Sequence, residues 1–306
     1  MVGRLVNSAP APIDPVVPVA VAALAIALFV GMDASMKAVT LAIGVYNAML
    51  WRSLAGLAGS GAIWLAVRRP WPAPATMRVH LVRGGVTTVM ALAWFWGIAR
   101  LPLAEAIALS FIAPLIALYL AAAVLSERVG PKALGGSLLG FAGVLAIVLT
   151  RANAPMSADG LAGAAAILAS AVLYAFNIVL MRKQALIAKP VEVAFFQNLI
   201  AAALLVCAAP FLAELPPPGQ VPGVLLSAGL ALASALLLAW AYRRAEAQAL
   251  APVEYTALIW GALFGFLVFG EEVGAMTLVG GALIVAGCWI AARPDGQPQS
   301  PAEAAT

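Results

Sequence analysis

Long apolar segments separated by short polar breaks recur along the whole chain. A bilayer core of about 30 Å is crossed by roughly 20 apolar helical residues, so segments of that length predict membrane-spanning helices. Proline-rich breaks such as WPAPA at 71–75 and ELPPPGQVPG at 214–223 separate them. The pattern predicts ten spans, at residues 16–37, 45–67, 79–99, 103–125, 132–150, 160–182, 191–213, 222–243, 252–270 and 274–292. The predicted fold class is therefore an all-α membrane protein.

The chain also repeats itself. Residues 96–148 reappear without a gap at residues 240–292, shifted by 144 positions. Residues that coincide under this shift include the pairs Trp96/Trp240, Arg100/Arg244, Glu127/Glu271 and Gly143/Gly287. Such self-similarity predicts two copies of one unit, a first five-helix repeat at 1–152 and a second at 153–306, in one integral membrane domain. Because five is odd, the second copy enters the membrane from the opposite side, and inverted repeats are typical of secondary transporters.

Composition supports a polytopic membrane protein. Of the 306 residues, 64% are hydrophobic and 10% charged, and the mean hydropathy is +1.02, which excludes a pair of soluble domains. With the N-terminus inside, twelve Lys and Arg residues fall on the cytoplasmic side and three outside, so both termini are expected in the cytoplasm. The net charge of +4 forms no soluble cationic patch, so the expected partners are the lipid bilayer and a small-molecule substrate, without nucleic acid.

Charged residues inside spans need a partner or a cavity, because each costs about 2.5–3.5 kcal/mol on insertion scales. Asp33 and Arg52 lie at similar depth in the first two spans. The second repeat has Asn177 in place of Asp33 and, after a two-residue gap, Asn198 in place of Arg52. This paired change predicts that Asp33 and Arg52 form a structural ion pair. Two alternatives stay open: Asp33 as a substrate or proton site, and a local pair of Asp33 with Lys37.

Polar residues in the third span share one helix face. His80, Arg83, Thr87, Met90 and Trp94 follow each other at intervals of three or four, which predicts a cavity-lining stripe. The alternative for His80 is an interfacial histidine, and its titration near neutral pH would suit gating or coupling. Arg83 can bind a substrate carboxylate or reach lipid phosphates. Trp94 can contact substrate or belong to an aromatic belt.

The sixth span carries a second polar face, formed by Ser170, Tyr174, Asn177 and Met181. Tyr174 and Asn177 are candidates for a substrate-binding wall, whereas the span serines suit helix contacts. Two further substrate-binding candidates complete the set. Ser110 precedes Pro114, which frees a carbonyl group in the fourth span, and Tyr255 lies beside Glu254 near the start of the ninth.

Outside these stripes, two patterns have simpler interpretations. Gly136 and Gly143 in the fifth span and Gly280 and Gly287 in the tenth are seven residues apart, so each pair shares a face and suits close helix packing. Glu127, Glu271 and Glu272 lie in predicted loops and are interpreted as surface charges.

Two runs connect the chain with a known family. PLIALYLAAAVLSERVGPKALGGSLLGFAGVLAIV at 114–148 and LIWGALFGFLVFGEEVGAMTLVGGALIVAGCWIAA at 258–292 each place an acidic residue at a helix exit before a glycine-spaced helix. With Arg52 and the run WFWGIARLPLAEAIAL at 94–109, the chain resembles the EamA-type ten-helix members of the drug/metabolite transporter superfamily, which include YddG-like amino-acid exporters. The resemblance implies metabolite efflux across a bacterial inner membrane. It also implies a central cavity lined by helices one, three, four, six, eight and nine. The second repeat differs from the family pattern at one position, because Leu258 occupies the place that Pro114 has in the first repeat.

We therefore predict a secondary transporter that exports small metabolites, with neutral or aromatic amino acids as leading candidates, by alternating access around a central cavity. The alternatives are a transporter of another metabolite or drug class, such as a lipid-like or phosphorylated solute, and a channel-like permease. Few unpaired buried cations argue against phosphorylated solutes. No enzyme motif occurs, so no catalytic residue, metal or cofactor is predicted. Ten helices can enclose a site without a second copy, so a monomer suffices.

Overall fold

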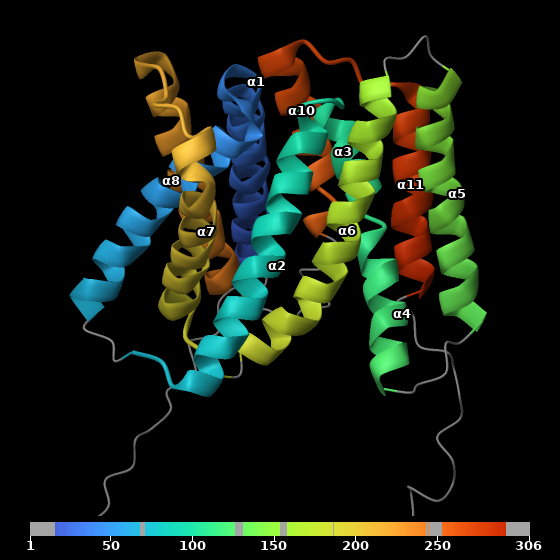
Figure 1. Ribbon diagram of the computed structural model, residues 1–306. Helices are drawn as coiled ribbons and strands as arrows, with labels where there is room; N and C mark the ends of the chain where they lie inside the picture. Colours follow the sequence, from blue (N-terminus) through green and yellow to red (C-terminus); the bar gives the residue numbers. More distant parts are fainter. Residues whose placement is uncertain are drawn as a thin grey trace, which may run out of the picture. The chain divides into compact units, whose positions relative to one another are not determined.

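The chain is helical throughout the residues that the structure describes. This structure, a computed structural model, describes residues 16–67, 71–125, 131–153, 158–185, 187–242, 244 and 253–291. The elements are α1 (Val16–Val67), α2 (Pro74–Ile98), α3 (Leu103–Ser110), α4 (Ala113–Leu125), α5 (Pro131–Asn153), α6 (Ala158–Ala185), α7 (Pro190–Leu212), η1 (Pro218–Gln220), α8 (Val221–Tyr242), α10 (Ala257–Phe269) and α11 (Ala275–Ala291) (Figure 1). No strand occurs in these ranges, which confirms the all-α class. The predicted cytoplasmic cations Arg4 and Arg293 and the loop residue Glu127 lie outside them.

The first two predicted spans form the single element α1, divided at one residue. Its 52 residues extend over about 78 Å at about 1.5 Å per residue, more than twice the thickness of a bilayer core. Gly44 has φ 77° and ψ 157°, a backbone conformation that residues with a Cβ atom rarely adopt. The two parts of α1 therefore take different directions from Gly44 (Figure 1). A glycine turn, rather than a loop, connects the two spans.

Two other predicted spans are interrupted, at corresponding positions of the repeats. The span predicted at 103–125 divides into α3 and α4 at residues 111–112. The span predicted at 252–270 has a turn at residues 255–256, after which α10 begins. The shift between the two breaks is the same 144 residues that relates the repeats.

Hydrogen bonds repeat with the breaks. The carbonyl of Ile112 accepts from the backbone N–H groups of residues 115 and 116, both at 3.1 Å, and that of Thr256 accepts from residues 259 and 260 at 2.9 and 3.1 Å. Pro114 lacks an N–H group, which favours the first break. The second break forms without proline. Leu258 stands in the place of Pro114, and its N–H donates to the carbonyl of Tyr255, three residues back, at 3.2 Å. Proline is therefore not required for the interruption.

The helices group into two compact units, and each unit draws on both repeats. Unit 1 comprises residues 1–70 and 189–271, and unit 2 comprises residues 71–188 and 272–306. Within unit 1, α1 packs against α7, α8 and α10. Within unit 2, α2 packs against α6, and α5 packs against α11. The predicted boundary at residue 152 follows the sequence repeat, whereas the packing follows this interleaved division.

The predicted glycine contacts between the fifth and tenth spans are confirmed in unit 2, where these spans are α5 and α11. A Cβ atom on Gly143 would lie 2.5 Å from the carbonyl oxygen of Gly280, and one on Gly280 would lie 2.7 Å from that of Gly143. A Cβ atom on Gly287 would overlap the carbonyl oxygen of Gly136. Only hydrogen fits at these positions, so the two helices approach to backbone contact.

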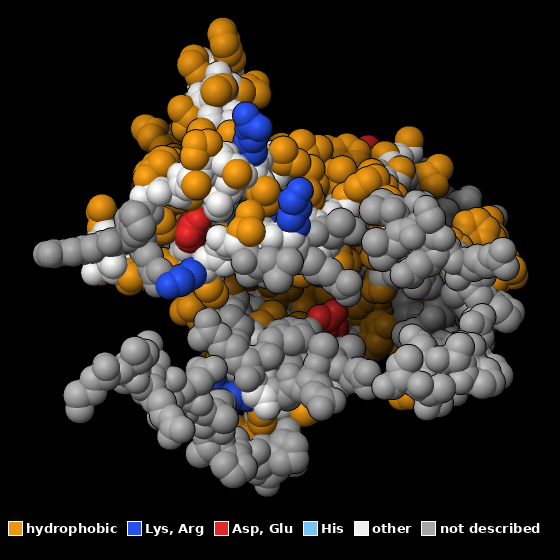
Figure 2. Space-filling view, turned by 90° about the horizontal axis from the view of Figure 1, so that it is seen from below, with side chains coloured by type: hydrophobic (Ala, Val, Ile, Leu, Met, Phe, Trp, Pro, Cys, Tyr) orange, Lys and Arg blue, Asp and Glu red, His pale blue; other side chains and the backbone are white. Residues whose placement is uncertain are grey.

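The described surface is rich in apolar side chains. Phe211 is 87% exposed, Leu65 76% and Ile259 66%, and Figure 2 shows hydrophobic side chains with few charged ones between them. Among the described helices, five are long and apolar enough to cross a bilayer, α1 included, and further apolar helices are shorter. Such surfaces suit lipid rather than water. The count of ten spans and the cytoplasmic position of both termini stay predictions.

Candidate functional site

A polar cluster joins α2 and α6 inside unit 2. The Nε atom of Arg83 donates a hydrogen bond to Oδ1 of Asn177 at 3.0 Å, and Nη1 of Arg83 donates to Oε1 of Gln184. The Nε2 atom of Gln184 lies 2.6 Å from Nδ1 of His80. His80, Asn177 and Gln184 are 1%, 4% and 3% exposed. The structure thus brings together His80 and Asn177, two of the predicted substrate-binding residues, through Arg83 and Gln184.

Local helix geometry places these side chains. His80 and Arg83 lie one turn apart on α2, and Asn177 and Gln184 lie two turns apart on α6, so each pair shares a helix face. A further contact joins the same two helices, because the hydroxyl of Ser170 on α6 donates to the carbonyl of a residue on α2, Met90, at 3.0 Å. That bond agrees with the interpretation of span serines as helix contacts.

Gln184 fixes the hydrogen-bonding state of its neighbours. Arginine can only donate, so the amide oxygen of Gln184 must face Arg83 and its NH₂ group must face His80. That NH₂ group can only donate, so Nδ1 of His80 accepts, and the neutral ring carries its proton on Nε2.

Sequence analysis missed Gln184 because it ended the sixth span at residue 182, whereas α6 continues to Ala185. The signal was present. Gln184 continues the spacing of three or four that links Tyr174, Asn177 and Met181.

The remaining predicted site residues of unit 2 are more dispersed. The Thr87 hydroxyl is buried and donates within α2, to the carbonyls of Arg83 at 2.9 Å and Gly84 at 3.1 Å. Tyr174 is 40% exposed and interacts electrostatically with Arg83. Trp94 and Ser110 are half-buried. Trp94 lies on α2, and Ser110 lies at the end of α3, where its hydroxyl donates to the carbonyl of residue 107 at 2.7 Å.

Tyr255 belongs to unit 1, where it is half-buried at the turn before α10. The same unit contains Asp33 and Arg52, both on α1. Asp33 is 2% exposed and attracts Arg52 electrostatically. The structural role predicted for this pair stays a prediction.

Lys37, one turn after Asp33 on α1, forms an ion pair with Glu271. The two side chains are only 5% and 17% exposed, and the Lys37 ammonium lies 5.0 Å from the ring centre of Phe269. The interpretation of Glu271 as a surface charge is therefore wrong. Gly270 has φ 65° and ends α10, and the backbone N–H of Glu271 then donates to the carbonyl of Gly265 at 3.1 Å. This left-handed turn folds the carboxylate back toward α1.

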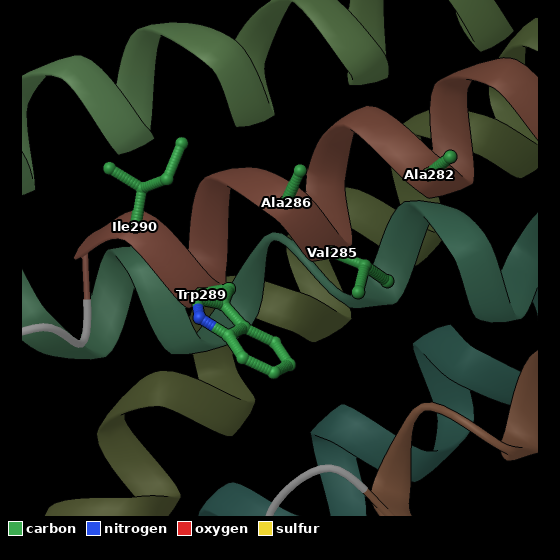
Figure 3. A pocket seen from close by; sticks show the side chains of 5 residues that line it. All are labelled: Ala282, Val285, Ala286, Trp289 and Ile290. Atoms are coloured by element: carbon green, nitrogen blue, oxygen red, sulfur yellow. The ribbon is translucent and has the colours of Figure 1, made fainter.

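Two other features bear on the chemistry. No group of three or more His, Cys, Asp or Glu side chains that could hold a metal occurs among the described residues. An apolar hollow lies along α11, where the small side chains of Ala282 and Ala286 are flanked by Val285, Trp289 and Ile290 (Figure 3). Its lining suits lipid chains better than a polar solute, so the polar cluster of α2 and α6 is the candidate site.

A helical fold that is built from two repeats and has several helices long and apolar enough to cross a bilayer defines a multi-pass membrane protein. The sequence profile of the EamA-like transporter family matches residues 17–149 and, 144 positions on, residues 161–293. The chain belongs to this family, part of the drug/metabolite transporter superfamily. It is a transporter rather than an enzyme, as predicted.

Individual relatives carry different names. The Pseudopaline exporter CntI of Pseudomonas aeruginosa is 29% identical over 88% of this chain and 94% of its own. A riboflavin transporter of Rhizobium johnstonii is 30% identical over 67% of each chain. A crystal structure of a protein that is 22% identical matches with a TM-score of 0.59, over 90% of this chain and 96% of that one, and it supports the fold alone.

Proposed function

We propose that this protein is a secondary exporter of the bacterial inner membrane that moves a small carboxylate-bearing metabolite, with neutral and aromatic amino acids as first candidates. The observation that carries the proposal is the environment of Arg83. Its hydrogen-bond acceptors among the described residues are the neutral amides of Asn177 and Gln184. An arginine held by neutral groups inside an apolar helix pair is available to an anion.

A carboxylate would improve on these partners. Hydrogen bonds between charged groups are roughly twice as strong as neutral ones, and the guanidinium group binds a carboxylate through two parallel bonds. A substrate carboxylate can therefore replace Gln184 at Nη1. Asn177 then keeps Nε in place, so the arginine is already oriented when the substrate arrives.

The position of the cluster supports export. Arg83 lies nine residues after Pro74, or about 13 Å along α2, and Gln184 lies in the last turn of α6. In the predicted topology both points lie in the inner half of the membrane, where an exporter loads its substrate. The inverted repeat supplies the two states of alternating access.

The relatives favour a small organic solute but leave its identity open, because one is named for pseudopaline and another for riboflavin. Riboflavin provides a useful contrast with amino acids because it has no carboxylate. If Arg83 binds a substrate carboxylate, any transport of riboflavin should not depend on the Arg83 side chain. An equal loss of riboflavin and L-phenylalanine transport on removal of that side chain would exclude a carboxylate-specific role.

The test is counterflow in proteoliposomes with labelled L-phenylalanine, glycerol 3-phosphate and riboflavin. We expect saturable exchange of L-phenylalanine, and the KM should rise about 10- to 100-fold in Arg83→Gln, because a hydrogen bond to a charged group contributes about 1.5–3 kcal/mol. The exposed Arg78 on the same helix gives the matched control, Arg78→Gln. Transport of glycerol 3-phosphate without any amino acid would refute the proposal, and flux without exchange would indicate a channel.

A further inference from the structure

The indole N–H of Trp260 has no hydrogen-bond acceptor among the described residues. Trp260 lies on α10 in unit 1, and its Nε1 atom is buried although the ring as a whole is only half-buried. Polar groups buried at membrane depth are normally satisfied inside the protein, because hydrocarbon offers no acceptor. An orphaned donor at this position requires an explanation.

The predicted span at residues 252–270 places Trp260 deeper than the usual position of a membrane tryptophan. Trp260 lies nine residues before Phe269, the last residue of α10, and therefore about 13 Å from that end of the helix. Belt tryptophans lie at the membrane surface, where their N–H groups reach water or headgroups. In the predicted span, Trp260 lies near the middle and is too deep for that arrangement in a bilayer core about 30 Å thick.

Other polar groups of unit 1 show that its packing can provide acceptors. The indole N–H of Trp51 donates to the carbonyl of Glu214 at 2.9 Å, and the hydroxyl of Ser234 donates to that of Ala25 at 2.8 Å. The buried hydroxyl of Thr40 also lacks a partner. A threonine hydroxyl can turn toward a carbonyl of its own helix, whereas an indole N–H cannot.

The surroundings of Trp260 form an aromatic surface next to the helix break. Its ring stacks on Phe264 with centroids 6.2 Å apart and planes 24° apart. Gly31 of α1 lies against Phe264, since a Cβ atom there would be 3.7 Å from that ring. The backbone N–H of Trp260 donates to the carbonyl of Thr256 at the break. The first repeat has Ile116 at the equivalent position, so this donor exists in only one repeat.

We propose that Trp260 is a substrate contact and a determinant of specificity, an inference that rests on the proposed transport function. Its N–H donates to a carbonyl or carboxylate oxygen of the substrate, while an apolar or aromatic part of the substrate lies against the rings of Trp260 and Phe264. In the present conformation Nε1 is covered, and rotation of the half-buried indole ring presents it to the substrate. The orphaned donor is thus a hydrogen bond that the substrate completes.

Trp260→Phe tests this directly, because it keeps an aromatic ring and removes only the donor and part of the ring area. Without substrate, the variant should unfold in detergent at the same temperature as the native protein or higher, because an unsatisfied donor is removed. In counterflow with L-phenylalanine, the KM should rise about 5- to 20-fold with little change in kcat. Trp51→Phe is the matched control, and it should lower the unfolding temperature while leaving the KM unchanged.

A second readout does not depend on transport. In protein labelled with ¹⁵N at the indole groups, the Trp260 resonance, assigned from its loss in Trp260→Phe, should shift when L-phenylalanine or riboflavin is added. An unchanged KM together with an unmoved resonance for both probes overturns the inference, as does a loss of stability in Trp260→Phe equal to that in Trp51→Phe. A normal KM in Arg83→Gln alongside a raised KM in Trp260→Phe would refute the carboxylate proposal alone.

Discussion

Unit 1 and unit 2 each hold a basic side chain within an apolar helix bundle, but the groups that accept its hydrogen bonds differ in charge. In unit 1, Lys37 pairs with a carboxylate, Glu271, from the same unit. In the described part of unit 2, the acceptors of Arg83 are two neutral amides. The first arrangement is closed, because its opposite charge is built in. The second leaves the arginine able to bind an anion from outside, and the proposed function rests on this difference.

Among the variants that test this difference, Glu271→Gln should have the largest effect on stability. Removing the carboxylate strands the buried ammonium of Lys37, so the unfolding free energy should fall by about 3–5 kcal/mol, measured by titration with sodium dodecyl sulfate in mixed micelles. Glu272→Gln is the control, because this exposed neighbour should change stability by less than about 0.5 kcal/mol. An equal effect of the two variants would show that the pair is not structural.

A second test concerns Asp33 and Arg52. If they form a structural pair, Asp33→Asn should cost about 3 kcal/mol of unfolding free energy, and adding Arg52→Asn should recover at least half of it. The double variant imitates the asparagines that the second repeat has at these places. The KM for substrate should not change. A raised KM with unaltered stability would instead favour Asp33 as a substrate or proton site.

A third test asks what stabilises unit 2. Gly143→Ala places a methyl group against the backbone of α11 and should cost about 1–3 kcal/mol of unfolding free energy. The control is Gly135→Ala on the same helix, where a Cβ atom meets nothing within 4 Å, and alanine should be neutral or stabilising by up to about 1 kcal/mol. If Gly143→Ala were harmless, the packing of α5 on α11 would not be the main support of this unit.

The test with the smallest expected effect gives Arg83 a built-in carboxylate partner like that of Lys37. Gln184→Glu gives Arg83 a carboxylate partner inside unit 2, as Glu271 does for Lys37, so a substrate carboxylate must compete with it. The KM should rise about tenfold, equivalent to about 1.4 kcal/mol, while thermal stability is kept or improved. Lys183→Gln, at an exposed neighbour on α6, should leave the KM unchanged. An unaltered KM in Gln184→Glu would mean that Arg83 does not hold the substrate.

Sequence patterns predicted which residues lie on the polar helix faces better than they predicted which residues those side chains contact. The polar stripe of α2 was predicted because His80, Arg83 and Thr87 recur at intervals of three or four. Asn177 on α6 was predicted as a site residue for the same reason. Gln184 was missed because the apolar signal ends before the helix does. Glu271 was misassigned because a turn residue beside a polar loop gives no local sign that the chain folds back onto Lys37.

The sequence by itself determined the helical class, the duplication, the membrane environment and the glycine faces of α5 and α11. These properties depend on side-chain type and on spacing along one helix, which hydrogen bonds between near neighbours enforce. Only the tertiary structure decided which helices form each compact unit, where the second helix break lies, and which acceptor each buried cation receives. Those outcomes depend on the rotation and approach of helices far apart in the chain, as with Lys37 and Glu271, 234 residues apart.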